Sequence, residues 1–299
     1  TPCDLQTALG EAGTGADLYL ARGVYTGTGR TIVSITHSIN LYGGWDGSAS
    51  TPPTRDPNTH LTIINGEDAR RGIEIAGPVT VTLEGLTLAN GKIISTSHAV
   101  WKGAGLYAKD AVLTLRHTNI YSNVVDVFDV DSSRAYGGGV AIDGGSLRVE
   151  TSVFRGNGAW AKSSSHGGGI SIEQPLGATV TDTRFQDNDA WHASGLYFFG
   201  RTHEHTPLTL SHNTFTGNGY GKSVGSARGG YAGAVKILNA QVRIDNSIFR
   251  DNKATNDYGA VSVWNSDMAL TNSVITGNEN GRTTGLYLSG VAPFTVTNT

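Results

Sequence analysis

Two carboxylates, Asp143 and Glu173, end two similar segments of the chain, GGGVAID (137–143) and GGGISIE (167–173). If these segments form equivalent strands on neighbouring coils, the two side chains lie about 5 Å apart, because parallel strands are spaced by about 4.8 Å. Carboxyl groups at such a separation can serve as the acid and the nucleophile of a retaining glycosidase. The sequence therefore predicts Asp143 and Glu173 as catalytic candidates.

Aromatic, basic and histidine side chains accompany these carboxylates. With alternate strand residues facing outward, one predicted column contains Tyr107, Ala141, Ser171, Tyr197, Lys236, Ser262 and Tyr287. The next contains Lys109, Asp143, Glu173, Phe199, Leu238, Trp264 and Ser289. We expect aromatic rings to stack on sugars, lysines to flank an acidic substrate, and His166 or His192 to carry protons. The loops that enter these strands add Trp160, Lys162, His166, Trp191, His192, Arg228 and Tyr231 as binding candidates.

The same outward face admits two other interpretations. It could bind a glycan or another partner without catalysis, or it could be an ordinary solvated surface, since outward strand residues of a solenoid are polar in any case. A polysaccharide lyase would need a base and a charge neutraliser, such as Ca²⁺ or arginine, near a uronate carboxylate. The sequence offers candidates for these roles but no motif that fixes them.

Metal ligands are suggested at two places. Asp126, Asp129 and Asp131 lie in one segment, NVVDVFDVDSS (123–133), and oxygen-rich loops can hold Ca²⁺. The spacing lacks the glycine and the distal glutamate of an EF-hand. His203 and His205 are two residues apart in RTHEHT (201–206), but a zinc site needs further ligands. We therefore expect no certain cofactor and keep calcium as an option.

An internal repeat must position these residues. A tetrapeptide of the type FxxN recurs, and its copies end at Asn123, Asn157, Asn188, Asn218, Asn252 and Asn278. The spacings are 34, 31, 30, 34 and 26 residues, which average about 31. Each copy is followed by a variable polar loop and a small-residue entry into a β-like run. A period of this length indicates one solenoid coil per repeat.

The short runs inside each repeat predict an all-β fold. SLRVE (146–150) and QVRID (241–245) alternate, which places Leu147 and Val149 on one face. Stacked coils of this kind form parallel sheets around a narrow apolar interior, a parallel β-helix. Recurrent asparagines can hydrogen-bond along the axis as ladders do in cross-β stacks, and the glycines permit positive φ and close approach between coils.

The N-terminal part is less regular. DLQTALGEA (4–12) predicts a short amphipathic capping helix with Asp4 as N-cap. We expect residues 1–15 to form this cap, 16–103 the first, less regular coils, and 104–299 regular coils, all in one domain (1–299). STPPTRDPNTH (50–60) predicts a loop. The chain stops inside a coil with an uncapped end, so we expect that residues are missing, that a further domain follows, or that the open end stacks on a partner such as a second copy.

Composition excludes several classes of protein. The net charge is −3, with no lysine or arginine run, which argues against nucleic-acid binding. There is no apolar stretch of about 18 residues, so we expect no membrane span. Cys3 is the single cysteine, so no intramolecular disulfide is possible; we expect it to pack at the cap, with a lipid anchor or an intermolecular disulfide as alternatives.

The alternation of FxxN with GG[AG][IV] resembles the repeats of polymorphic outer-membrane proteins and related secreted right-handed β-helix proteins. The segments LYLARGVYTG (18–27) and LYGGWDG (41–47) are similar to the N-terminal portion of many bacterial surface β-helix proteins. The resemblance covers essentially the whole chain. It implies a right-handed helix in the pectate-lyase-like superfamily, export, and an extracellular or cell-surface location after removal of a signal peptide.

That superfamily includes lyases, glycosidases, epimerases, adhesins and passenger domains, so the fold alone does not give the function. We expect a secreted or surface-displayed bacterial β-helix with an adhesive, structural or glycan-binding role, able to associate end to end. The alternative is a lyase or glycoside hydrolase that acts on the outward face of the strands following the glycines.

Overall fold

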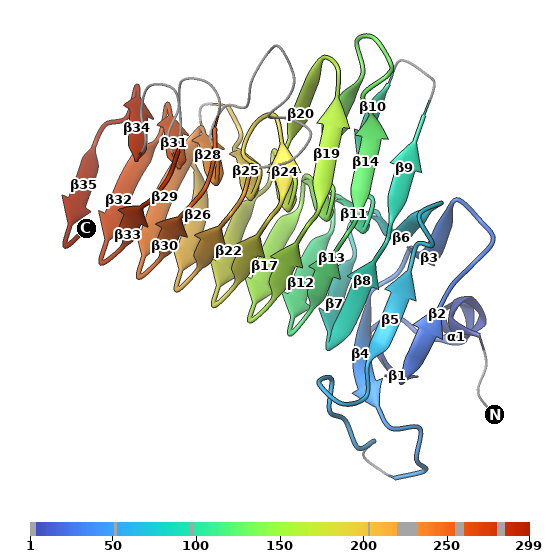
Figure 1. Cartoon of the computed structure of the whole chain (residues 1–299). Helices are drawn as coiled ribbons and strands as arrows, with labels where there is room; N and C mark the ends of the chain where they lie inside the picture. Colours follow the sequence, from blue (N-terminus) through green and yellow to red (C-terminus); the bar gives the residue numbers. More distant parts are fainter. Residues whose placement is uncertain are drawn as a thin grey trace.

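The computed structural model describes residues 4–50, 53–95, 99–202, 204–219, 233–254, 260–279 and 285–299. Each coil runs through three long sheets, A, B and C, and all their strand pairs are parallel. Figure 1 shows the coils stacked into an elongated solenoid with the two termini at opposite ends. The predicted parallel β-helix is therefore confirmed.

Within the described residues, sheet A has ten strands and sheets B and C have nine each. Sheet A comprises β1 (Ala16–Ala21), β4 (Ile39–Trp45), β7 (Thr80–Glu84), β12 (Val112–Arg116), β17 (Ser146–Glu150), β22 (Gly177–Thr181), β26 (Thr206–Ser211), β29 (Ala240–Asp245), β32 (Asp267–Thr271) and β35 (Phe294–Thr297). Sheet B comprises β2 (Gly23–Tyr25), β5 (Thr62–Asn65), β8 (Leu86–Ala89), β13 (Asn119–Tyr121), β18 (Val153–Arg155), β23 (Arg184–Gln186), β27 (Thr214–Thr216), β30 (Ile248–Arg250) and β33 (Val274–Thr276). Sheet C comprises β3 (Thr31–Ile35), β6 (Arg71–Ala76), β11 (Leu106–Lys109), β16 (Val140–Asp143), β21 (Ile170–Glu173), β25 (Leu196–Phe199), β28 (Val235–Leu238), β31 (Val261–Trp264) and β34 (Leu286–Ser289).

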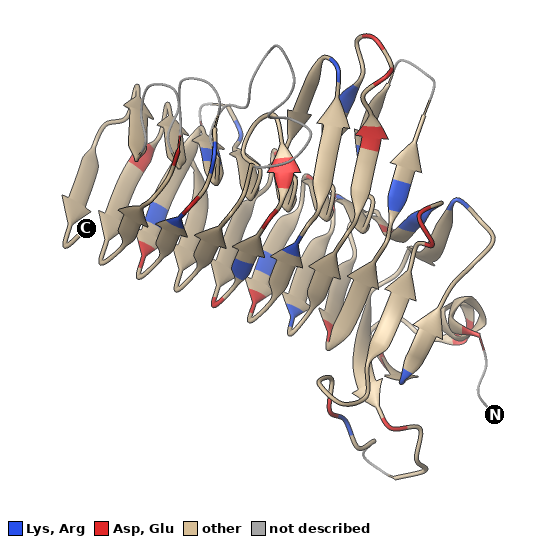
Figure 2. Cartoon of the chain, viewed as in Figure 1, with Lys and Arg blue, Asp and Glu red and all other residues tan. Residues whose placement is uncertain are grey.

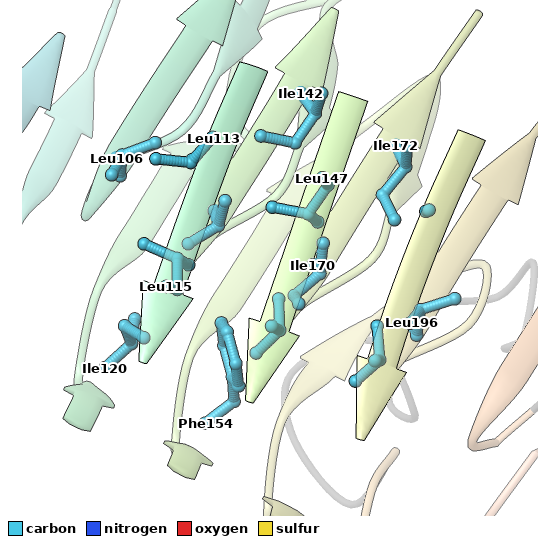
Figure 3. Close-up of a cluster of buried hydrophobic side chains, with 14 of the residues drawn as sticks. Leu106, Leu113, Leu115, Ile120, Ile142, Leu147, Phe154, Ile170, Ile172 and Leu196 are labelled. Carbon is cyan, nitrogen blue, oxygen red and sulfur yellow. The ribbon is translucent and has the colours of Figure 1, made fainter. Parts of the chain in front are cut away.

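The solenoid interior is filled by alternate residues of the three sheets. Leu147 and Val149 of β17 are buried, as the alternation predicted, and they pack with inward residues such as Ile170 and Ile172 of β21 (Figure 3). Phe185 stacks between the rings of Phe154 and Phe215, with ring centroids 4.9 and 4.5 Å apart. Repetition of one residue type at one coil position therefore builds a continuous apolar column along the axis.

The recurrent asparagines form the predicted ladder. From Asn123 to Asn278 the side-chain nitrogen of each one donates to the side-chain oxygen of the next, at 2.8–3.0 Å. The same nitrogen also donates to a backbone oxygen, as that of Asn157 does to Ile120 at 2.9 Å. The buried backbone groups of these turns thus find their hydrogen-bond partners in the asparagine side chains, as buried polar groups generally require.

Each of the three glycines that precede β21 is required for a different structural reason. Gly167 has a φ of 62°. A Cβ on Gly168 would lie 2.5 Å from the carbonyl oxygen of Asp189, and one on Gly169 would lie 2.5 Å from that of Gly195 on the next coil. The expected close approach between coils is confirmed at Gly169. Gly168 instead makes room for strand β24 (Asp189–Ala190), which lies where the repeat predicts a polar loop.

That strand belongs to a pair of small sheets, D and E, which we call the wing. Part of the expected variable loop after Asn123 and after Asn157 is instead a strand pair that leaves the solenoid and returns, and β9 and β10 form such a pair one coil earlier (Figure 1). The wing has its own apolar cluster, which includes Val125, Ala135 and Ala159. Sheet D comprises β9 (Lys92–Ile94), β14 (Val124–Val127), β19 (Gly158–Ala161) and β24 (Asp189–Ala190), and sheet E comprises β10 (Val100–Lys102), β15 (Arg134–Tyr136) and β20 (Ser164–His166).

The two ends of the described chain differ. Helix α1 (Leu5–Glu11) has Asp4 as its N-cap and buries Leu5 and Leu9, as predicted. On the last coil, Phe294 and Val296 pair with buried residues of β32 but are 58% and 46% exposed. Charged residues of both signs are found on turns and strands along the length of the solenoid (Figure 2). Among the described residues, we find no helix with the length and apolarity needed to cross a membrane.

Candidate functional site

The outer face of sheet C carries a column of partly exposed side chains. The strand register pairs Asp143 with Glu173, Glu173 with Phe199, Phe199 with Leu238, and Leu238 with Trp264. All five are half-buried, and we call Asp143, Glu173, Phe199, Leu238 and Trp264 the outer strip. The alignment of side chains expected from the glycine segments is thus observed, whereas a catalytic role for Asp143 and Glu173 stays a prediction.

A lysine from the wing joins the two carboxylates of the outer strip. Lys102 Nζ lies 2.9 Å from Asp143 Oδ2 and 2.6 Å from Glu173 Oε2. Asp143 also accepts a hydrogen bond of 3.3 Å from the hydroxyl of Tyr107. Burial opposes the charge of Lys102, but its hydrogen bonds to Glu173 and Asp143 outweigh burial and raise its pKa above the ordinary value. Lys102 is therefore a firmly charged ammonium between two acids.

Beside the outer strip, one face of the wing presents a stack of rings. Tyr136 stacks on His166 and His166 stacks on His192, with centroids 4.8 and 4.7 Å apart. We call these three residues the ring stack. Lys102 Nζ lies 5.4 Å from the centroid of the Tyr136 ring, and Trp191 stacks on His192 at 5.6 Å. The faces of these rings are therefore directed at one another along the solenoid axis.

The ring stack lies against the other column of sheet C. The ring of His166 is 4.4 Å from that of Tyr197, which is only 7% exposed, and Ser171 is 1% exposed. Burial lowers the pKa of His166 well below its usual range and lowers that of His192 to about 3; the Lys236 ammonium adds to both shifts. Burial also raises the pKa of Tyr197. Both histidines are therefore neutral at physiological pH.

Two polar atoms under the ring stack have no hydrogen-bond partner among the described residues. They are Nδ1 of His166 and Oγ of Ser171, and both are shielded from solvent. The other ring nitrogen of His166, Nε2, lies 2.6 Å from the hydroxyl of Ser164. An uncompensated buried polar atom is costly, so both atoms can accept a partner supplied by water or a ligand.

Lys236 is a buried cation in different surroundings from Lys102. Its Nζ lies 3.4 Å from Nδ1 of His192 and 5.9 Å from the centroid of the Trp264 ring. No carboxylate contacts it among the described residues. Burial lowers its pKa to about 8, so the amine is neutral in about a tenth of molecules at pH 7.

A hollow of about 450 Å³ adjoins the acidic end of the outer strip. Its lining includes Asp143, Asp110, Gln174, Arg201 and Glu204. These residues belong to the turns that lead from sheet C to sheet A. A ligand on the outer strip thus has room to continue past Asp143.

Other predicted binding residues lie elsewhere. Trp160 is on β19 of sheet D, where its Nε1 donates to Asp189 at 2.7 Å. Lys162 pairs with Asp131 at 2.5 Å near the end of the wing. Lys109 is exposed beside Asp143 on β11. The structure therefore brings Trp191, His192, Tyr197, Phe199, Lys236 and Trp264 together. Trp160 lies beside Trp191 in the register of sheet D, because Ala159 pairs with Ala190, whereas Lys162 lies near the end of the wing.

The calcium role expected of Asp126, Asp129 and Asp131 stays a prediction. The three residues line one hollow of about 520 Å³, with Asp126 near the end of β14 and Asp129 and Asp131 in the following turn. Among the described residues, no group of three or more His, Cys, Asp or Glu side chains is arranged so that it could hold a metal ion. The zinc suggestion is not supported either, since His205 pairs with Asp267 at 3.2 Å. Cys3, His203, Arg228 and Tyr231 lie outside the described residues.

Sequence reasoning missed Lys102 and Tyr136. Both belong to sheet E, whose short strands precede the glycines. In register, Lys102, Tyr136 and His166 occupy one column. The signal was available, because VWK, RAY and SSH stand immediately before the small-residue entries of three consecutive repeats.

Comparison with known proteins bears on the fold. The structure of pectate lyase Pel9A is similar, with a TM-score of 0.46 and 16% sequence identity over 99% of this chain and 72% of that chain. No curated protein matches the chain. A family model described as a right-handed beta helix region matches residues 58–232, more than half of the chain. The chain therefore belongs to the right-handed β-helix family, whose handedness is the one that the repeat resemblance implied.

Proposed function

We propose that the protein binds a glycan chain along the outer strip, parallel to the solenoid axis. One observation carries this proposal: Phe199, Leu238 and Trp264 stand in register on three consecutive strands, and each is half-exposed. Parallel strands are about 4.8 Å apart, close to the advance of one sugar residue in an extended chain. The two aromatic rings can therefore contact sugars two residues apart.

The acidic end of the outer strip supports binding more than hydrolysis. A retaining pair needs one protonated acid and one ionised nucleophile. Lys102 contacts both carboxylates, which removes the difference between them that such a pair requires. Carboxylates fixed in this way are good acceptors for sugar hydroxyls, whose hydrogen bonds would orient the chain.

A location outside the cell is part of the proposal. It rests on the alternation of FxxN with glycine entries, which resembles that of polymorphic outer-membrane proteins. The adhesive role follows from this location together with the outer strip. Fractionation of the source cells, with detection of the chain in the surface or secreted fraction, tests it; recovery only from the cell interior would contradict it.

Binding is tested with a glycan array followed by calorimetry on the selected oligosaccharide. We expect Phe199→Ala and Trp264→Ala each to weaken binding about tenfold, because aromatic side chains dominate such contacts. Phe128→Ala is the matched control, since Phe128 is 37% exposed on the wing and outside the outer strip. Equal affinity of all variants, or no glycan bound by the unmodified protein, would contradict the proposal.

Lys236 favours a second candidate function, a polysaccharide lyase. A buried lysine whose pKa is about 8 can take a proton from the carbon next to a uronate carboxylate. Incubation with uronate-containing glycans would then give an unsaturated product that absorbs ultraviolet light. Loss of this activity in Lys236→Met, with glycan binding retained, would support the lyase. If the protein binds glycans of a broad panel but degrades none of them, the lyase is excluded and the glycan-binding function stands.

End-to-end association remains a proposal for this chain. It rests on the repeat, because a second copy can continue the same parallel sheets through the strand edges of a coil. Solution scattering over a range of concentrations should show elongated oligomers, and Phe294→Ser with Val296→Ser should abolish them. A monomer at every concentration would remove this proposal.

A further inference from the structure

A different face of the solenoid, the outer face of sheet B, has a single sign of charge. The nine described strands of sheet B contain three arginines, Arg155, Arg184 and Arg250, and no acidic residue. Sheet A, by contrast, carries both signs on its strands, as in Arg148 and Glu150 of β17. A protein with a net charge of −3 thus concentrates unmatched positive charge on one sheet.

Two of these arginines have no partner of their own. Neither Arg155 nor Arg184 forms an ion pair or a side-chain hydrogen bond with any described residue, and both are exposed. Arg250 differs, because its Nε lies 3.2 Å from Asp251 in the turn after β30. The unmatched charge is therefore centred on β18 and β23.

The register brings these two arginines close together. Arg155 pairs with Gln186, and Arg184 pairs with Val153, so the arginines are diagonal neighbours on adjacent strands. Their Cα atoms are about 8 Å apart from strand spacing and rise. Two exposed guanidinium groups on such close positions of neighbouring strands attract an anion that can contact both.

The surface beside the arginines is hollowed. A hollow of about 330 Å³ is lined by both arginines together with Tyr121 and Gln186. It shares Asn119 and Val153 with a second hollow of about 500 Å³, which is bounded by the segment around Pro57. The two hollows form one trough along successive coils. An extended chain can lie in it over several repeats.

The carboxylate that lines the trough is already paired with arginines of the protein. Glu84 lines the second hollow, but its oxygens contact Arg55 at 3.2 Å and Arg116 at 3.4 Å. Apolar contact is also available, since Leu61 is 47% exposed in the first hollow. The trough therefore combines unpaired cations, polar donors and apolar surface, which suits a charged sugar polymer better than a small ion.

We infer that sheet B is a second binding site, whose ligand is a sulfated polysaccharide with a sulfate group held between Arg155 and Arg184. A carboxylate has two oxygens, and one arginine fork satisfies them. A sulfate ester has three terminal oxygens and can accept from both guanidinium groups and from the Gln186 amide together. This site is independent of the outer strip, which belongs to sheet C.

Calorimetry with dextran sulfate, polygalacturonate and uncharged dextran tests this site. We expect dextran sulfate to bind about tenfold or more tightly than polygalacturonate, and uncharged dextran not to bind. The double variant Arg155→Ala/Arg184→Ala should weaken binding of dextran sulfate about tenfold, and inorganic sulfate should compete at high concentration.

The control is Arg148→Ala/Arg243→Ala, which removes the same charge from exposed arginines of sheet A. It should leave affinity within about twofold, because long-range charge effects are weak and screened. Equal losses in the two double variants, or equal affinity for dextran sulfate and polygalacturonate, would overturn the inference. Trp264→Ala should leave dextran sulfate binding unchanged, which separates this site from the outer strip.

Discussion

Lys102 Nζ lies 2.6 Å from Glu173 Oε2, although the two residues belong to coils that are two repeats apart. Asp143, on the coil between them, contacts the same ammonium. One side chain of the wing therefore ties three successive coils together. It also sets the charge at one end of the outer strip.

Removal of this ammonium should destabilise the protein. Lys102→Met leaves Asp143 and Glu173 side by side without a counter-charge, so we expect the free energy of unfolding to fall by about 2 kcal/mol. Urea denaturation followed by circular dichroism measures this. Lys109→Met, on an exposed residue beside Asp143, should change it by less than about 0.5 kcal/mol. Similar free energies of unfolding for the two variants would show that the contacts of Lys102 contribute little to stability.

The ring stack should make stability depend on pH. The pKa of His192 is about 3 when folded and about 6.5 when unfolded, so the unfolded chain binds more protons between these values. The stabilisation is therefore complete above pH 6.5 and is lost as the pH falls towards 3. Between pH 7 and pH 5, the free energy of unfolding of His192→Gln should therefore fall by about 2 kcal/mol less than that of the unmodified protein.

The control for this pH effect is His212→Gln, because His212 is exposed on the turn after β26. Urea denaturation at pH 7 and at pH 5 should give the same change in the free energy of unfolding for this variant as for the unmodified protein. If His192→Gln behaves like the control, the histidine is not held neutral by its surroundings.

The asparagine ladder should be intolerant of truncation. Asn157→Ala removes the acceptor for Asn123 and the donor to Asn188 and to the Ile120 carbonyl. Several buried groups lose their partner, so we expect a loss of about 3 kcal/mol in the free energy of unfolding. Asn119→Ala, on an exposed residue of β13, should be nearly neutral. Thermal unfolding of the two variants decides the matter, and equal melting temperatures would contradict the ladder's role.

The glycine entry into β21 should resist even a methyl group. Gly168→Ala places a Cβ within 2.5–2.7 Å of the backbone of Asp189, so the wing must move, at a cost of about 2 kcal/mol or more. Gly13→Ala meets nothing within 4 Å and serves as the control. A melting temperature of Gly168→Ala equal to that of the control would show that the wing is loosely packed.

Most of the solenoid could be predicted because it repeats. The asparagine ladder, the alternation in β17 and the alignment of Asp143 with Glu173 all follow from one period, since residues at equal positions of each coil must meet their counterparts. A second ladder escaped notice: the backbone nitrogen of Thr118 donates to Ser152, and that of Asn213 donates to Ser247. Its members vary between Ser, Thr and Asn, which hides the repetition.

The wing and its contacts could not be predicted in the same way. Its strands have two to four residues, too few to establish a period. The position of Lys102 depends on how the wing folds back over sheet C, a tertiary relation that no local pattern encodes. The ring stack follows from the same fold, so its histidines could be named from the sequence but not their mutual stacking.

The ladder from Asn123 to Asn278 also gives the molecule an electrical direction. From Asn123 to Asn252 each amide donates one hydrogen to the side-chain oxygen of the next coil and the other to a backbone oxygen of a preceding coil. Every side-chain oxygen of the ladder therefore accepts from the coil before it, so the carbonyl dipoles point one way and polarise one another. The ladder thus has a fixed direction along the solenoid axis, whereas strand dipoles run across that axis.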